Sequence, residues 1–432
     1  MACLLKLRPC ISVYSGTLAC DAGPTALRNV GSAPRPAPQL RRGSDLSNRL
    51  SGGDWPNAAH ELLYILALSS RHNSTIQASH TGAMKVVISG AGLGGLACAV
   101  ACKKEGISVH ILERTKKLSE VGAGIQIPPN GSKVACRLGY FEALTEHGIM
   151  LDHLDYCRYS SGNILLRRDQ DWLQKSFGSP WMVIHRADYH KVLWGRSKEL
   201  GVELSLGAET VHVDFNTTEV ILKSNEKISA DVIIGADGLW SMTRDSILEC
   251  RSPPTATGDL AYRVTISAEQ IESLNDASVS ELCSQSGVKT WLGPRSHCVF
   301  YPLKHGSEFN IVLLVPDNLE HGVKRAEGDV DEMRALFEGW DERLSKMLSL
   351  VKSVEKWKLC HHEELACWSK NSVTVLGDAC HPTLPYQAQG AAMAVEDGAV
   401  LGRLLGLLKT STKDASTLQE RIPGVLKLYE EL

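Results

Sequence analysis

Residues 85–113 read KVVISGAGLGGLACAVACKKEGISVHILE. The stretch opens with the apolar run Val86–Ile88, which predicts a strand buried on both faces. A glycine cluster follows, then an alanine-rich segment with helical spacing, and a second apolar run from Val109 to Leu112 ends at Glu113. Strand, glycine-rich turn, helix, strand and acid, in this order, predict a dinucleotide-binding βαβ unit.

The glycines of this cluster have separate expected roles. Gly90 permits the tight turn, and Gly92 lets the backbone approach a pyrophosphate. Gly95 allows the helix to pack closely on the strands, and the helix N-terminus offers its amides and the positive end of its dipole to the phosphates. Glu113 stands where a carboxylate would accept hydrogen bonds from a ribose diol. The motif predicts a dinucleotide without indicating which one.

Length and composition set broad limits. The 432 residues are enough for two or three domains with a large core. A net charge of −3 gives no electrostatic case for binding nucleic acid or an anionic membrane. No apolar run is long enough for a stable membrane span. The 13 cysteines are scattered without CxxC pairs, which favours a reduced intracellular protein. The sequence does not indicate the oligomeric state.

Residues 1–83 differ in composition from the rest of the chain. They are rich in Ser, Ala, Pro, Gly and Arg and show no sustained periodicity, so we expect a disordered extension. Two origins fit this extension: an organelle transit segment, or an overlong gene model, because Met84 directly precedes the first core strand. We favour the second origin and a cytoplasmic protein, with a mitochondrial location as the alternative.

Three later positions each allow two interpretations from the residues alone. Gly122 and Gly124 suggest a loop whose backbone passes close to something flat or bulky, or an ordinary tight connection. Arg186, at a strand-to-helix junction, could clamp a ligand phosphate or diol, or pair with Asp188 or a helix carbonyl. Asp237 ends a buried strand where ligands bind in open α/β sheets, but a capping role in the turn explains it as well.

A further buried strand, 372–378, has the most specific surroundings. It ends in Asp378, runs into a proline-braced loop and reaches a helix that begins near Gly390. Asp378 can accept hydrogen bonds from a polyol. The amides around Gly390 and Ala391 can meet a developing negative charge at the helix N-terminus.

The middle of the chain has a different character. Asn130 is expected to cap a helix that runs to about Leu138, and residues 151–184 contain a hairpin-like pattern. The run His361–Glu364 does not predict a metal site, because neighbouring strand residues point to opposite faces. We expect amphipathic helices at 329–337 and 342–350. Short β-rich runs predict an antiparallel or mixed sheet that covers a substrate: 261–266, 288–292, 298–303 and 309–315.

Together these motifs resemble the FAD-dependent aromatic monooxygenases of the salicylate hydroxylase type, particularly fungal members that act in secondary metabolism. They appear in family order across residues 84–432. The resemblance implies an α/β fold of the group A flavoprotein monooxygenase type, with a Rossmann-like FAD-binding domain and an inserted mixed-sheet substrate domain. The expected division is 84–254 for the first FAD-binding part, including a small strand insertion near 151–184, then 255–368 for the substrate sheet and 369–432 for the returning FAD-binding segment.

The resemblance also implies which residues hold FAD. Gly124 is expected beside the flavin, and Arg186 in contact with the cofactor. The ADP half of FAD is expected at the residues of the first motif: Gly90, Gly92, Gly95 and Glu113.

The later motifs have their own implied roles. Asp237 is expected to serve both FAD and passing NADPH, and Asp378 to bind the ribityl chain. The isoalloxazine ring is expected against Ala391, and Gly390 is a further residue expected to bind the cofactor. One departure is Ala388, where the family usually has glycine, and we expect it to alter the mobility of the loop.

The implied reaction combines three small molecules. NADPH or NADH delivers a hydride to FAD, and the reduced flavin reacts with O2 to form a C4a-hydroperoxide. This species hydroxylates an aromatic, phenolic or polyketide-like molecule while the protein keeps water out. Arg263 occupies the family's substrate-face arginine position and is expected to stabilise the phenolate form of the substrate. Tyr301 is a second catalytic candidate that would orient the substrate, although a core tyrosine explains it as well.

Two other functions fit the same motifs. A flavin halogenase or dehydrogenase would use the same cofactor fold, but the lysine and the Trp-rich loop expected of a halogenase are not evident. A truncated, inactive flavin-binding protein is the alternative outside the enzymes, because family members usually continue past the helix ending near Leu432. The intact cofactor motifs favour the monooxygenase.

Overall fold

A central parallel sheet forms the nucleotide-binding half of the protein, seen in a computed structural model that describes residues 84–118, 123–412 and 414–432. All neighbouring strands are parallel except the β19–β20 pair. Val86, Val87 and Ile88 are fully buried, so this apolar run is the central strand that the sequence predicts. The strand order is β19 (Ser369–Lys370), β20 (Val373–Val375), β12 (Val232–Gly235), β1 (Lys85–Ser89), β2 (Ser108–Glu113) and β8 (Glu203–Leu206).

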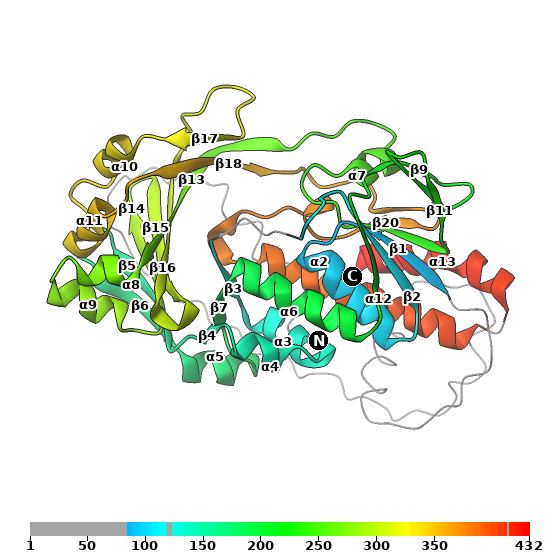
Figure 1. Cartoon of the computed structure of the whole chain (residues 1–432), viewed down its shortest axis with the longest axis horizontal. Helices are drawn as coiled ribbons and strands as arrows, with labels where there is room; N and C mark the ends of the chain where they lie inside the picture. The colour runs from blue at the N-terminus through cyan, green and yellow to red at the C-terminus, as the bar shows by residue number, and fades with distance from the viewer. Residues whose placement is uncertain (1–83, 119–122, 413) are drawn as a thin grey trace, which may run out of the picture. The chain divides into compact units, whose positions relative to one another are not determined.

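The two faces of this sheet have different covers (Figure 1). Helices that share a core with Val86 and Ile88 cover one face. On the other face, Val87 and Ile233 pack against a small antiparallel sheet and a short helix. The helices of the first face are α2 (Leu93–Lys104), α3 (Pro129–Leu138), α4 (Phe141–Thr145), α6 (Arg186–Glu199), α12 (Gly390–Ser411) and α13 (Ala415–Glu431). The elements of the second face are β9 (Thr210–Asp214), β10 (Glu219–Leu222), β11 (Lys227–Ser229) and α7 (Met242–Ile247).

Helices α2 and α12 pack unusually closely. Small residues at every fourth position of α12 face α2, so the two backbones approach each other directly. A Cβ atom on Gly398 would lie 2.6 Å from the backbone nitrogen of Cys98, and one on Gly402 would lie 2.5 Å from the Cβ of Ala101. At Gly406 it would lie 2.5 Å from the Glu105 side chain. No larger residue fits at the first two positions without moving one of the helices.

A second, eight-stranded sheet forms the other half of the molecule (Figure 1). One face packs on four short helices around Trp291, Phe300 and Tyr262, and the opposite face carries Arg263. The strand order is β17 (Arg325–Gly328), β18 (Val354–His361), β13 (Thr255–Ser267), β16 (Glu308–Pro316), β15 (Ser296–Leu303), β14 (Gly287–Gly293), β5 (His153–Arg158) and β6 (Ile164–Asp169). The helices are α8 (Ala268–Glu272), α9 (Ala277–Cys283), α10 (Val330–Leu336) and α11 (Glu342–Ser349).

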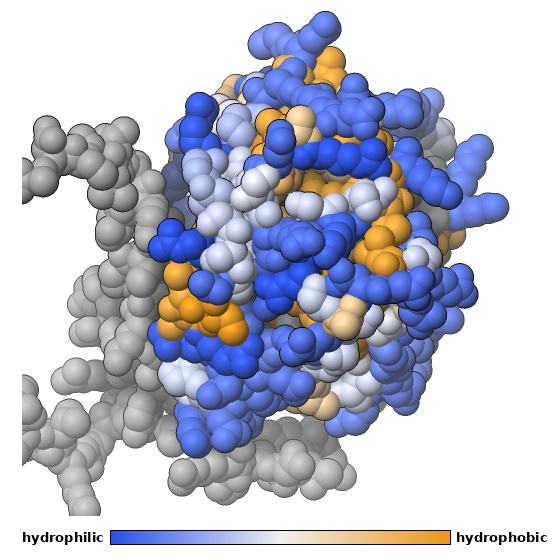
Figure 2. Space-filling view, turned by 90° about the vertical axis from the view of Figure 1, so that its left-hand side faces the viewer, coloured by the Kyte–Doolittle hydropathy of each residue, from blue (hydrophilic) through white to orange (hydrophobic). Residues whose placement is uncertain are grey.

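Figure 2 shows the end of the molecule at which these helices cover the large sheet. Hydrophilic residues occupy most of this surface, and hydrophobic ones gather in separate patches. The edge strand β6 exposes three consecutive hydrophobic side chains: Ile164, Leu165 and Leu166.

A three-stranded sheet joins the two halves. It consists of β3 (Gly124–Ile127), β7 (Met182–His185) and β4 (Ile149–Met150), all antiparallel to their neighbours. Strand β7 leads directly into α6 at Arg186, which places this arginine at the junction that the sequence predicts. The remaining short elements are α5 (Gln170–Phe177), η4 (Lys304–Gly306), η5 (Gly377–Ala379) and η6 (Pro385–Gln387).

Three details differ from the sequence predictions. Asn130 lies inside α3 and does not cap it, because the helix begins at Pro129 with Pro128 in the N-cap position. Strands β5 and β6 join the large sheet through the parallel β5–β14 pair, although their segment, 151–184, was expected within the FAD-binding part. The large sheet also gains β17 and β18, which the sequence pattern did not predict. The expected domain boundaries themselves remain predictions.

Some expectations fall outside the described residues. They are the disordered extension over 1–83 and the close backbone approach at Gly122. Among the helices that the structure describes, none combines the length and the apolar character needed to cross a bilayer.

Candidate functional site

The glycine turn after β1 has the geometry of a phosphate-binding loop. Gly90 has a φ of +111°, and a Cβ there would lie 2.3 Å from the carbonyl oxygen of Ala236. A Cβ on Gly95 would lie 2.2 Å from the carbonyl oxygen of Gly90. Gly92 differs, because no atom of the described chain lies within 4 Å of the position of its Cβ. The N-terminus of α2 has no side-chain cap, so its amides face this open space.

Glu113 connects the end of β2 to this turn. Its Oε2 accepts a hydrogen bond from the Ala91 amide at 2.9 Å, and its Oε1 accepts one from the Thr115 amide at 2.9 Å. A carboxylate can accept about four hydrogen bonds, so both oxygens retain capacity for a ribose diol. His190 of α6 also holds the turn, since its Nε2 lies 2.7 Å from the Ala91 carbonyl oxygen. The local sequence pattern does not predict this role of His190.

Asp378 lies at the start of the second segment that is expected to bind the cofactor. A Cβ on Gly390 would lie 4.0 Å from the Asp378 Oδ1 atom, so the carboxylate sits beside the first residue of α12. This helix has no side-chain cap at its N-terminus. Burial raises the pKa of Asp378, while the charges of His381 and Arg186 act to lower it. The side chain is nevertheless solvent-accessible.

The two segments that are expected to bind the cofactor meet through their helices. A Cβ on Gly94 of α2 would lie 3.1 Å from the Cβ of Ala394 of α12. The N-terminal ends of both helices are therefore neighbours, one beside Glu113 and the other beside Asp378. Ala391 is half-buried against the same core. This arrangement fits an extended dinucleotide that runs from α2 to α12.

Arg263 faces the same region from the large sheet. Desolvation lowers the pKa of Arg263, the Tyr301 hydroxyl acts to raise it, and the Arg186 charge acts to lower it. The Arg263 side chain is nevertheless solvent-accessible. Arg186 influences both Asp378 and Arg263. The structure therefore brings together predicted residues that lie far apart in the sequence.

Tyr301 packs directly on the backbone of Gly124. A Cβ on Gly124 would lie 2.4 Å from the Tyr301 ring, and the Gly124 amide donates a hydrogen bond to the Asn310 Oδ1 at 3.0 Å. Tyr301 is 3% exposed and belongs to a hydrophobic cluster with Leu154. Burial raises its pKa well above the usual range, against the opposing effects of Arg263 and Asn310. Tyr301 is therefore one bulky group that packs in the space left by the missing side chain of Gly124. This packing supports the interpretation of Tyr301 as a core tyrosine, and its role in orienting a substrate remains a prediction.

Asp237 performs the capping role that its sequence left open. Its Oδ1 accepts a hydrogen bond from the Ser241 hydroxyl at 2.5 Å, and its Oδ2 accepts from the amide and the hydroxyl of Thr243, both at 3.0 Å. These bonds order the turn before α7. The same turn packs on Gly90, because a Cβ there would lie 3.3 Å from the Asp237 amide nitrogen. A direct contact of Asp237 with FAD or NADPH remains a prediction.

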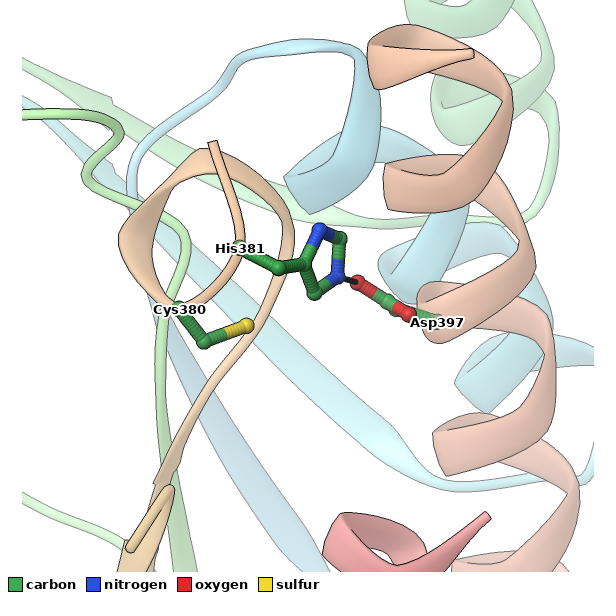
Figure 3. A group of neighbouring side chains, drawn as sticks. All are labelled: Cys380, His381 and Asp397. Carbon is green, nitrogen blue, oxygen red and sulfur yellow. Dashed lines mark hydrogen bonds and ion pairs between the residues drawn. The ribbon is translucent and has the colours of Figure 1, made fainter. Parts of the chain in front are cut away.

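Asp397 organises the segment around Asp378 (Figure 3). Its Oδ2 accepts hydrogen bonds from the Gly377 amide at 2.8 Å and from the His381 Nε2 at 2.6 Å. Burial alone would lower the pKa of His381, but the Asp397 hydrogen bond and charge outweigh it and raise the pKa. Donor atoms of Cys380, His381 and Asp397 lie within 4.8 Å of one another. Burial keeps the Cys380 thiol protonated, and its Sγ donates to the Gly377 carbonyl at 3.3 Å. This donor set fits a hydrogen-bond network better than a metal site.

Asn130 of α3 contacts the start of α12, a role that the local sequence pattern does not predict. The Asn130 Nδ2 donates hydrogen bonds to the Gln389 Oε1 at 2.9 Å and to the Glu396 Oε2 at 2.8 Å. Asn130 and Glu396 are 266 positions apart, so no local pattern pairs them. Ala388 adopts a left-handed conformation with a φ of +55°. This geometry explains why a glycine would suit the position.

A cavity of about 300 Å³ opens between the large sheet and the loop before α12. Tyr386 of this loop donates from its hydroxyl to the Asp259 Oδ2 at 2.5 Å. Its ring lies edge-on to His297 of β15, with 5.2 Å between ring centroids. Burial lowers the pKa of His297 and favours the neutral imidazole. Leu314 of β16 completes an apolar side of the cavity.

Comparison with known proteins identifies the family. Residues 83–420 match the family described as FAD binding domain. The chain belongs to this FAD-binding domain family. It is 40% identical over 355 residues to the FAD-dependent monooxygenase OpS4 of Beauveria bassiana (strain ARSEF 2860), covering 81% of each chain. It is 30% identical to a 3-hydroxybenzoate 6-hydroxylase of Klebsiella oxytoca, covering 80% of this chain and 86% of the relative.

A solved structure shows the same fold. The substrate complex of a salicylate hydroxylase superposes with a TM-score of 0.67 at 23% identity, covering 81% of this chain and 84% of that one. The predictions of the group A flavoprotein fold and of an FAD-dependent monooxygenase are therefore confirmed. FAD is the cofactor that the family binds.

Proposed function

We propose that this monooxygenase uses NADPH or NADH and O2 to hydroxylate a small aromatic, phenolic or polyketide-like molecule. The observation that carries the proposal is the position of Arg263. It is a solvent-accessible cation on the face of the large sheet that also carries Tyr301, whose ring packs on Gly124. The names of the similar 3-hydroxybenzoate 6-hydroxylase and salicylate hydroxylase support a phenolic substrate.

The residues present fit FAD at both ends of the proposed site. The open space at Gly92 and the uncapped amides of α2 would receive the pyrophosphate, and Glu113 would bind the ribose. Asp378 would bind the ribityl chain, and the N-terminus of α12 would face the flavin ring. Bound FAD supplies the redox chemistry, accepting a hydride from NAD(P)H and activating O2.

The chain's own residues would prepare the substrate. Arg263 would hold the substrate oxygen as an anion, because a nearby cation favours the ionised form of a phenol. Partial desolvation of Arg263 strengthens this attraction relative to bulk water. The ion pair of Asp397 with His381 would fix the backbone around Asp378. Tyr386 and His297 line the cavity between the large sheet and the loop before α12, where they would limit the entry of water.

The proposal is tested by offering the purified, FAD-loaded protein a panel of phenols with NADPH or NADH. We expect at least one phenol to stimulate consumption of the reduced nicotinamide, with a product that has gained one oxygen atom by mass spectrometry. A product that gains a halogen, or one that only loses hydrogen, would replace this proposal with a halogenase or a dehydrogenase. Failure of the purified protein to bind FAD would contradict every enzyme function considered.

A further inference from the structure

The register of the large sheet places an acid directly opposite Arg263. In the antiparallel pair of β13 and β18, Arg263 faces Glu355, and on the next strand Glu327 faces Glu355. Directly opposed residues of an antiparallel pair point to the same face, with Cβ atoms about 4.5–5.5 Å apart. An arginine and a glutamate at this spacing ordinarily form an ion pair. In such a pair, Glu355 would neutralise Arg263, the cation that is proposed to hold the substrate.

Glu355 forms its ion pair with a different arginine. Arg325 of the edge strand β17 donates through its Nη2 atom to both carboxylate oxygens of Glu355. The Arg325 guanidinium carbon lies 4.3 Å from the centroid of the Trp357 ring, on the strand between the two arginines. The corresponding atom of Arg263 lies 5.8 Å from the same centroid. Trp357 therefore gives Arg325 a stacking surface while Arg325 holds the acid.

Within the part of the chain that the structure describes, Arg263 has no carboxylate partner. The acid that the register places opposite Arg263, Glu355, pairs with Arg325 instead, and no carboxylate within 84–118, 123–412 and 414–432 is among the groups that act on the pKa of Arg263. The charged and polar groups that act on it are Arg186 and the Tyr301 hydroxyl. An unpaired cation beside a second arginine attracts an anionic ligand more strongly than one with a neighbouring carboxylate.

We propose that Arg325 is a positioning residue that binds Glu355 so that Arg263 stays available to the anionic oxygen of the substrate. This inference rests on the proposed function, because it assumes that Arg263 receives the substrate. Loss of Arg325 leaves the fold intact, since exposed ion pairs contribute little to stability. It releases Glu355, which then competes with the substrate for Arg263 from within the protein.

The test uses phenylglyoxal, which modifies accessible guanidinium groups, on the FAD-loaded full chain. The modification rate of Arg263 is followed by mass spectrometry of its peptide, so no knowledge of the natural substrate is needed. We expect Arg325→Ala to slow modification of Arg263 about fivefold, the protection expected from an exposed ion pair. The double variant Arg325→Ala with Glu355→Gln should restore the wild-type rate, because the amide cannot pair with Arg263 in the same way.

A matched control removes an exposed ion pair elsewhere. Lys223→Ala breaks the pair with Glu209 on a different part of the chain and should leave the rate at Arg263 unchanged. An unchanged rate in Arg325→Ala, or a slowed rate that Glu355→Gln does not restore, would overturn the inference. The premise that Arg263 receives the substrate fails separately, if Arg263→Ala hydroxylates phenols at the wild-type rate while the labelling results are as expected. The proposed function itself fails if no phenol gains an oxygen atom, whatever the labelling shows.

Discussion

The substitution Gly92→Ala should weaken FAD binding while leaving the stability of the apoprotein nearly unchanged. The backbone at this position has a φ of −70° and a ψ of 179°, which alanine adopts without strain. No described atom lies within 4 Å of the added methyl group, so the free energy of unfolding of the apoprotein should change by less than about 0.5 kcal/mol. The methyl group would instead occupy the space expected for the pyrophosphate.

The cost to FAD binding follows from the hydrogen bonds that are lost. If the methyl group moves the pyrophosphate away from two amides of α2, each charge-assisted bond costs about 1.5 kcal/mol or more. The sum of about 3 kcal/mol corresponds to a roughly 100-fold increase in the Kd for FAD. Titration of the apoprotein with FAD, followed by quenching of flavin fluorescence, measures this change, and urea unfolding of the apoprotein measures stability.

Gly95→Ala provides the contrast within the same turn. Its Cβ would lie 2.2 Å from the Gly90 carbonyl oxygen, so the apoprotein itself should lose about 1–3 kcal/mol of stability. If Gly92→Ala binds FAD as tightly as the wild type, the pyrophosphate does not lie at this glycine and the assignment of the turn is wrong.

Three further predictions concern the other half of the site. Arg263→Ala should lower kcat/KM for a phenol at least tenfold while Arg263→Lys retains part of the activity, measured by product formation. Ala388→Gly should stabilise the protein by about 1 kcal/mol, because it relieves a left-handed alanine, and a lower midpoint of urea unfolding would contradict this. The pKa of His381, which faces Asp397 and Asp378, is raised above its ordinary value of 6.5, so its ion pair stabilises the fold fully below that pH and less as the pH rises through the raised value. The stability difference between wild type and His381→Gln should therefore shrink from pH 6 to higher pH, and a difference that grows would refute the pairing.

Local sequence signals predict much of the nucleotide-binding half. The run before Gly90 and the acid at Glu113 belong to one βαβ unit of about 30 residues, so short-range spacing determines both the strand positions and the turn. Asp378 and the start of α12 are predictable for the same reason. In each case the residues that form the feature lie close together in the chain.

The large sheet shows what spacing alone does not predict. Arg263 and Glu355 become neighbours only because β13 pairs with β18, and a shift of one residue would turn either side chain to the other face. The same holds for Asn130 and Glu396, which meet through the packing of α3 on α12. Asp237 is a different case, because its sequence position fits both a capping residue and a ligand-binding residue. The hydrogen bonds that Asp237 accepts from Ser241 and Thr243 show that it has the capping role.

The glycines of α12 have a consequence for how this enzyme can diversify. Gly398 and Gly402 allow α12 to pack directly against α2. The two helix ends that would bind opposite parts of the cofactor are therefore held at a fixed distance from each other. Sliding one helix along the other by a single residue, about 1.5 Å, would bring backbone into collision with backbone. Substitutions on the exposed face of the large sheet do not change this distance. New substrates can therefore be accommodated there without altering the spacing between the expected phosphate and flavin positions.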